Sequence, residues 1–201
     1  MLSGEKIAGQ LHSRWAACNI VYKDVTGSTN TDARELALSS AIHGTLVVAD
    51  KQESGRGSNG RGWETPAGTN IAMSLVVRPR VGVLQIPMLT LVMGLSVAEG
   101  IELALAEAGA GSEDGSQSAS ECGIKWPNDV VLGGRKVCGI LTELHLKPEG
   151  GIDDAVIGVG INVNMVDFPD EIKGVAGSLL TQTGIRVDRN ALVARVMERF
   201  E

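Results

Sequence analysis

The sequence predicts an α/β domain, and three observations support that fold class. With 201 residues and 43% hydrophobic content, the chain can bury one core of ordinary size. Residues 45–49 and 71–77 are short runs rich in β-branched side chains, which is typical of buried strands. Apolar residues recur at helical spacing over residues 87–109 and again after Asp188. We therefore expect strands and helices to alternate within a single domain.

Two helices are expected in the first forty residues. Ile7, Leu11 and Trp15 recur every fourth residue, which predicts a short amphipathic helix. Thr29 and Asp32 have the spacing of a capping box, so a second helix should begin there. Polar side chains thus gather at one helix N-terminus, where free backbone N–H groups can meet a ligand.

The second half of the chain predicts three more strands and a final helix. The strands are expected over residues 124–132, 136–144 and 155–163. Gly133-Gly134 fits a hairpin turn between the first two of them. Residues 109–123 are rich in Gly, Ser and acidic side chains, which predicts a solvated loop. Asp188 is the expected cap of the last helix.

Composition excludes several classes of function. The chain has 18 Lys plus Arg against 24 Asp plus Glu, a net charge of −6, which argues against a non-specific binder of nucleic acid or membranes. Cys18, Cys122 and Cys138 are odd in number and widely spaced, as in a reduced cytoplasmic protein whose cysteines serve packing. No signal peptide is expected. Acidic and helix-breaking residues interrupt residues 86–106, which predicts a buried helix and not a membrane span.

The most unusual segment is the glycine-arginine segment, residues 52–63. Its pattern Gly55-x-Gly57-x-x-Gly60 matches the dinucleotide fingerprint, but no helix start and no acidic residue about 20 positions later follow. It also imitates a P-loop, yet Arg61 and Gly62 stand where Lys and Ser or Thr are required. Both nucleotide-binding motifs are therefore excluded.

The residue types of this segment nevertheless suit an anionic small molecule. Its glycines let backbone N–H groups approach a ligand, and Arg56 and Arg61 supply fork-shaped donors for phosphate or carboxylate. Glycine and arginine alone would fit a flexible surface loop equally well. The neighbouring motifs separate these two interpretations.

Four further motifs carry a family resemblance. They are Ser28-Thr29-Asn30, Lys125-Trp126-Pro127-Asn128-Asp129, Lys136-Val137-Cys138-Gly139-Ile140-Leu141 and Gly158-Val159-Gly160-Ile161-Asn162-Val163-Asn164. In this order, and together with the glycine-arginine segment, they closely resemble the catalytic domain of biotin protein ligases over nearly the whole chain. The resemblance implies an α/β (α+β) fold, a mixed sheet flanked by helices, related to class II aminoacyl-tRNA synthetases and lipoate ligases.

The resemblance also implies a reaction in two steps. The biotin carboxylate attacks the α-phosphate of ATP to give biotinyl-5′-AMP and pyrophosphate, and a lysine of a biotin carboxyl carrier domain then attacks the mixed anhydride. Mg²⁺ is expected with ATP, although no carboxylate constellation in the sequence identifies its ligands. DNA and membrane partners are not expected, and a homodimer through an exposed sheet edge stays open.

Site residues follow from the same resemblance. Catalysis should be mainly positioning and charge neutralisation, so the implied catalytic residues are Lys125, Arg56 and Arg61. The implied biotin-binding positions are Ser28, Thr29, Asn30, Gln52, Gly55, Arg56, Gly57, Ser58, Lys125, Gly139 and Ile140. The implied nucleotide-binding positions are Arg61, Trp63, Asn70, Asn128 and Asn162.

The sequence departs from the family pattern in three places. Ser58 stands where relatives commonly carry a second arginine. Residues 1–201 are expected to form the catalytic domain alone, without the N-terminal winged helix of some relatives and without the SH3-like C-terminal domain of most. Two alternatives stay open: a catalytically weak biotin-binding or regulatory protein, and a lipoate or octanoyl transferase of the same fold. The KWPND motif favours biotin over the second.

Overall fold

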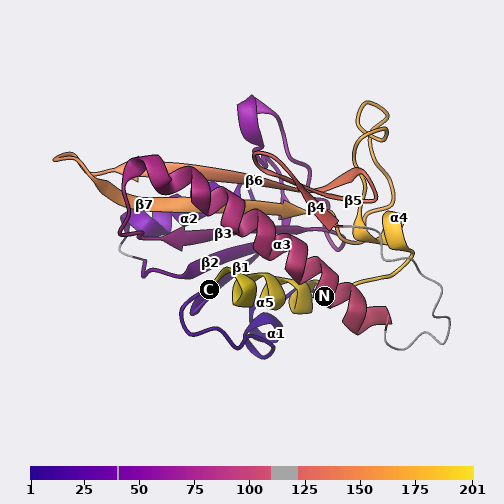
Figure 1. The fold of residues 1–201 in the computed structure, drawn as a ribbon. Helices are drawn as coiled ribbons and strands as arrows, with labels where there is room; N and C mark the ends of the chain where they lie inside the picture. Colours follow the sequence, from indigo (N-terminus) through magenta and orange to yellow (C-terminus); the bar gives the residue numbers. More distant parts are fainter. Residues whose placement is uncertain (40, 110–121) are drawn as a thin grey trace.

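A seven-stranded sheet forms the centre of the computed structural model, which describes residues 1–39, 41–109 and 122–201 (Figure 1). The strands are β1 (Asn19–Thr26), β2 (Thr45–Gln52), β3 (Ile71–Val77), β4 (Cys122–Lys125), β5 (Asp129–Leu132), β6 (Arg135–Leu146) and β7 (Ile152–Ile161), in the order β1-β2-β3-β7-β6-β5-β4. β1 and β2 are parallel, and the other neighbouring strands are antiparallel. The predicted fold class is confirmed. The loop expected over 109–123 lies almost wholly outside the described residues.

Helices cover both faces of this sheet. α2 (Thr29–Leu38) lies on one face, and α3 (Ile86–Gly109) crosses the other, with α1 (Gly4–Ala8) and α5 (Arg189–Phe200) beside it (Figure 1). Side chains along β3 alternate between the two layers, because successive strand residues point to opposite faces. Val76 packs under α2, whereas Leu75 and Val77 belong to the larger core. Shorter elements are α4 (Leu179–Thr183) and the turns η1 (Ser58–Gly60) and η2 (Val83–Gln85).

The first helix is shorter than the sequence predicts. α1 ends at Ala8 with Gly9 as its C-cap, so Leu11 and Trp15 lie outside it. Both side chains still pack against the core, and the Trp15 ring stacks on His43 with centroids 4.3 Å apart. Their regular spacing therefore reflects burial of an irregular segment and not a longer helix.

Two local predictions about the polar motifs were wrong in detail. Ser28, and not Thr29, is the N-cap of α2, and its side chain makes no capping hydrogen bond. The single strand expected over 124–132 is a hairpin instead, with β4 and β5 antiparallel on either side of residues 126–128. The predicted turn at Gly133-Gly134 is confirmed, since both glycines have positive φ between β5 and β6.

The long apolar helix belongs to the core. Within the described chain, Val83–Gly109 is the stretch that is long and apolar enough to cross a membrane by length and composition, a test that the core helix of a soluble protein also passes. Met93, Val97 and Ile101 are fully buried among the core residues. This burial fits the buried helix that the sequence predicts.

Candidate active site

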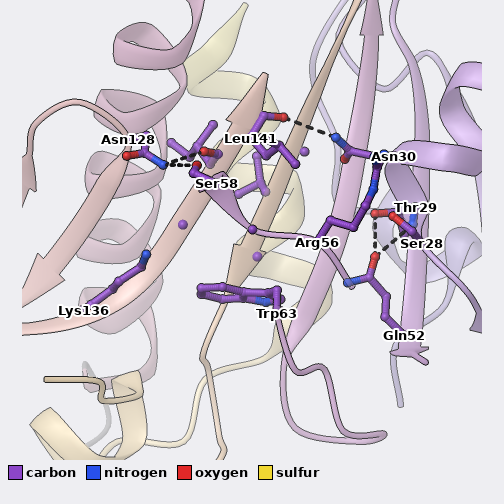
Figure 2. A pocket seen from close by; sticks show the side chains of 16 residues that line it. Ser28, Thr29, Asn30, Gln52, Arg56, Ser58, Trp63, Asn128, Lys136 and Leu141 are labelled. Carbon is purple, nitrogen blue, oxygen red and sulfur yellow. Dashed lines mark hydrogen bonds between the residues drawn. The ribbon is translucent and has the colours of Figure 1, made fainter. Parts of the chain in front are cut away.

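Two adjoining cavities mark the candidate site. The smaller one lies between the N-terminus of α2, the glycine-arginine segment and strands β6 and β7 (Figure 2). The larger one, of about 920 Å³, extends from that segment past the β4–β5 hairpin to α3 and residues 165–176. The residues that line both cavities are Gly57, Ser58, Trp63, Asn128, Lys136, Ile140 and Leu141. The two cavities therefore share a wall.

The N-terminus of α2 supplies neutral polar groups to the smaller cavity. Ser28, Thr29 and Asn30 are buried and line it. The backbone N–H of Thr29 donates to Oε1 of Gln52 over 2.9 Å, and Gln52 Nε2 donates to Thr65 Oγ1 over 3.3 Å. The structure thus brings together the four polar residues that the sequence assigned to one ligand.

Glycines on two strands form the floor of the smaller cavity. Gly139 of β6 pairs with Gly160 of β7, and the Trp63 ring lies over both. A Cβ on Gly160 would overlap Nε1 of Trp63, and a Cβ on Gly158 would overlap Oδ1 of Asn30. Only glycine therefore allows these side chains to approach the sheet so closely.

The indole of Trp63 leaves an unpaired donor. Its Nε1 is buried and has no hydrogen-bond partner among the described residues. A buried N–H without a partner is costly, so the group is suited to donate to a bound molecule.

The glycine-arginine segment is folded tightly back on itself. Gly57 N–H donates to the carbonyl of Arg61, and Trp63 N–H donates to the carbonyl of Gly55. A Cβ on Gly55 would overlap the Trp63 carbonyl, so Gly55 shapes the segment although it lines neither cavity. Ser58 Oγ accepts a hydrogen bond from Asn128 Nδ2 over 2.7 Å, which ties the segment to the β4–β5 hairpin.

The charge of Arg56 is already paired inside the protein. Its Nη2 donates to Oε2 of Glu143 over 2.9 Å, and the Arg56 side chain is half exposed. Arg61 is exposed and lines the larger cavity. Of the two arginines assigned to catalysis, Arg61 is thus the one that faces the larger cavity.

The structure does not bring Lys125 to the site. Lys125 is exposed on β4 and lines neither cavity. Lys136 lines both, with Nζ 2.6 Å from Asp129 Oδ1 and 5.5 Å from the centroid of the Trp63 ring (Figure 2). Among the residues that line both cavities, Lys136 carries the charge, and the sequence did not assign it to the site.

A β-bulge brings the Lys136 side chain to the side of β6 on which Gly139 lies. Val130 pairs with Cys138 and Val131 with Lys136, so Val137 is the extra residue of the bulge. In a regular strand, positions 136 and 139 would face opposite sides, whereas a bulge resets that alternation. A Cβ on Gly139 would indeed lie 3.3 Å from the Lys136 side chain. The sequence feature that could have pointed to Lys136 is its position close to Gly139 within the same motif.

Two of the asparagines assigned to the nucleotide serve the scaffold. Asn70 is fully buried and lines neither cavity; its Nδ2 donates to Asn162 Oδ1 over 3.2 Å. Asn162 lines the larger cavity, but its Nδ2 donates to the Gly177 carbonyl over 3.1 Å. Trp63 and Asn128 line both cavities, as a contact with both ligands would require. Of the three asparagines that the sequence assigned to the nucleotide, Asn128 is therefore the best placed to meet a ligand.

The described residues contain no preformed metal site. No group of three or more His, Cys, Asp or Glu side chains among them could hold a metal ion. Glu64 and Asp129 are the carboxylates that line the larger cavity, and Asp129 is paired with Lys136. A divalent cation would thus enter with a ligand that supplies most of its oxygen ligands.

Comparison with known proteins agrees with this geometry. Residues 22–162 match the model of the biotin/lipoate A/B protein ligase family. The chain belongs to this family. It is 40% identical over 202 residues to the bifunctional ligase/repressor BirA of Bacillus spizizenii, and 35% identical over 195 residues to the biotin–[acetyl-CoA-carboxylase] ligase of Mycobacterium tuberculosis. The alignments cover 100% and 94% of this chain.

A solved structure of the ligase family shows the same fold. The biotin protein ligase from Aquifex aeolicus in complex with biotin and ATP superposes with a TM-score of 0.71 at 34% identity, covering 91% of this chain and 68% of that one. The chain spans only 58% of the Bacillus relative and 64% of the mycobacterial one. Family and fold are established, and the activity follows as a proposal.

Proposed function

We propose that this domain is the catalytic domain of an ATP-dependent biotin protein ligase. In the first step an oxygen of the biotin carboxylate bonds to the α-phosphorus of ATP, and the bond to pyrophosphate breaks. In the second step the amine of an acceptor lysine bonds to the acyl carbon, AMP leaves, and the amine loses its proton. The acceptor is a biotin carboxyl carrier domain of a biotin-dependent carboxylase.

The shared wall of the two cavities carries this proposal. A reaction between an acid and a nucleotide needs two sites that meet at the reacting atoms, and these cavities meet at Lys136. The Lys136 ammonium is 2.6 Å from Asp129, and both groups line the larger cavity. We infer that Lys136 exchanges this partner for the biotin carboxylate and the α-phosphate, whose mutual repulsion it reduces.

The smaller cavity suits the ureido ring of biotin. Its neutral donors and acceptors come from Ser28, Thr29, Asn30 and Gln52, and Gly139 and Gly160 let the Trp63 ring lie close against the sheet at its base. Apolar surface from Ile140, Leu141 and the Trp63 ring would contact the ring and its aliphatic tail. This polar lining favours biotin over lipoate or octanoate, which lack a ureido group.

The larger cavity would then hold ATP. Arg61 provides a positive charge for the triphosphate, while Trp63 and Asn128 lie between the two ligands. The residues present do not build a resident magnesium site, so we propose that Mg²⁺ arrives bound to the phosphates of ATP.

We also propose where the protein acts and which partners it has. We infer a cytoplasmic enzyme, because Cys18, Cys122 and Cys138 are free thiols, and the edge strands β1 and β4 offer a place for a homodimer to form. The repressor activity named for the Bacillus relative is not part of the proposal, because the net charge of −6 gives these residues no basis for DNA binding.

Calorimetric titration with biotin, with and without ATP and Mg²⁺, tests the proposal when the mixture is then analysed by mass for biotinyl-5′-AMP. We expect biotin to bind, adenylate to form, and an added carrier domain to gain the mass of biotin. Binding without adenylate would identify a catalytically weak biotin-binding protein. Binding of octanoate in preference to biotin would identify the transferase alternative.

A further inference from the structure

A chain of hydrogen bonds runs behind the wall of the smaller cavity. Two of its members, Glu143 on β6 and Ser74 on β3, line neither cavity and belong to none of the sequence motifs. Ser74 is fully buried, and the Glu143 side chain is 29% exposed. They lie beneath Asn30, which the glycine at position 158 allows to reach the sheet.

Glu143 joins the glycine-arginine segment to the helix N-terminus. Its Oε2 accepts from Arg56 Nη2 over 2.9 Å and from Asn30 Nδ2 over 2.8 Å. The Ser74 hydroxyl donates to Asn30 Oδ1 over 2.6 Å, and its oxygen lies 2.8 Å from Oγ1 of Thr29. Thr29 contacts Gln52 Oε1 in turn. The chain therefore begins and ends in the glycine-arginine segment.

The Glu143 carboxylate, between Arg56 and Asn30, fixes the direction of these hydrogen bonds. A carboxylate only accepts, whereas an amide both donates and accepts, so the Asn30 amide must turn its nitrogen toward Glu143. Its oxygen then requires the single proton of Ser74. Asn30 Nδ2 also donates to the Leu141 carbonyl over 3.3 Å, so without the carboxylate this longer hydrogen bond alone would hold the amide, and the hydroxyl protons at Ser74 and Thr29 would be directed less strictly.

We propose that Glu143 is a positioning residue that fixes the donor and acceptor pattern of Asn30 and Thr29, and so selects a ligand with a ureido head group over one with an apolar end. This inference rests on the proposed function. A pocket built to hydrogen-bond its ligand rejects an analogue without those groups, because its own buried polar atoms are then left unpaired. Glu143 acts on the ligand through Asn30 and Arg56 and does not touch it.

Calorimetry with biotin and with octanoate tests this role in Glu143→Ala, Glu143→Gln and a matched control. The control is Asp153→Ala, which removes another strand carboxylate that pairs with an arginine, Arg78, at 3.5 Å. Asp153 lies on β7 and lines neither cavity. Thermal denaturation of each variant shows whether the protein is folded.

We expect Glu143→Ala to weaken biotin binding about tenfold and to leave octanoate binding within about twofold of wild type. Glu143→Gln can turn its amide oxygen toward Asn30, so it should recover most of the discrimination, and Asp153→Ala should keep all of it. Equal weakening of both ligands in Glu143→Ala, or unchanged biotin binding in a folded variant, would overturn the inference. Absence of biotin binding by the wild-type protein would instead overturn the proposed function.

Discussion

Lys136 reaches the wall between the two cavities only because β6 contains an extra residue at Val137. If its ammonium neutralises the reacting anions, Lys136→Ala should slow adenylate formation about 100-fold to 1000-fold, the effect of removing one preorganised charge or donor. Release of pyrophosphate in the presence of biotin, ATP and Mg²⁺ measures that rate.

Lys125→Ala is the matched control, since Lys125 is a nearby lysine that is exposed on β4. Its rate should stay within about twofold of wild type. A loss as large in Lys125→Ala as in Lys136→Ala would restore the assignment made from the sequence alone.

The three thiols differ in their surroundings, and their reactivity should differ accordingly. Burial raises the pKa of the Cys138 thiol, and burial with the nearby Glu102 carboxylate raises the pKa of Cys122 to about 12. Because the thiolate is the reactive form, both should resist alkylation at neutral pH. Cys18 is exposed, so iodoacetamide should label it first in the native protein. Peptide mass mapping would show this, and early labelling of Cys138 would contradict the buried position of β6.

The sequence could place side chains together where they follow one another along the chain in one motif. Ser28, Thr29 and Asn30 form one short motif, and the structure places all three in the smaller cavity. Glu143 and Ser74 could not be found in this way, because only strand pairing and the position of α2 bring them together. Lys125 was assigned because it matches the lysine of the family's KWPND motif, whereas the place of Lys136 depends on a bulge, which leaves no mark in a pattern of residue types.

At the scale of elements, the glycines of β6 and β7 form a floor that no other residue could provide. Gly160→Ala would place a Cβ inside the Trp63 ring and force that ring off the sheet. We expect biotin binding to weaken about tenfold to 100-fold, in keeping with the cost of overpacking. Gly123→Ala on β4 is the control, because the nearest side-chain atom would be 3.8 Å from the new Cβ. Calorimetry would measure both, and equal affinities would show that Trp63 is free to move aside.

The boundary between two strands was predicted at one turn and not at another. Gly133-Gly134 has the positive φ that a tight turn needs, and the hairpin between β5 and β6 is where the sequence placed it. Residues 126–128 contain Pro127 and Asn128, which also favour a turn, but β4 and β5 were taken for one strand. The consequence is functional, because this turn carries Asn128 into the wall of both cavities.

At the scale of the whole molecule, a buried ion pair connects the last helix to the sheet. Arg189 is 7% exposed, and its Nη1 donates to Asp50 Oδ1 over 2.7 Å and to the Asn70 carbonyl over 2.8 Å. Asp50 also accepts from the N–H of Gly68 over 3.0 Å. α5, the end of β2 and the start of β3 are thereby joined. None of these four residues lines either of the two cavities of the candidate site.

Arg189→Ala should therefore lower the stability of the protein without changing its affinity for biotin. Removing one partner of a buried pair leaves the other uncompensated, so we expect a loss of about 3 kcal/mol in the free energy of unfolding. The stabilisation that biotin adds depends only on its concentration and affinity, and it should be unchanged. Urea denaturation with and without saturating biotin measures both quantities. Arg195→Ala breaks two more exposed pairs, with Glu107 and Glu198, and should cost about 1 kcal/mol. If Arg189→Ala also removed the stabilisation by biotin, the Arg189–Asp50 pair would be coupled to the site, and biotin binding would depend on the stability of the scaffold.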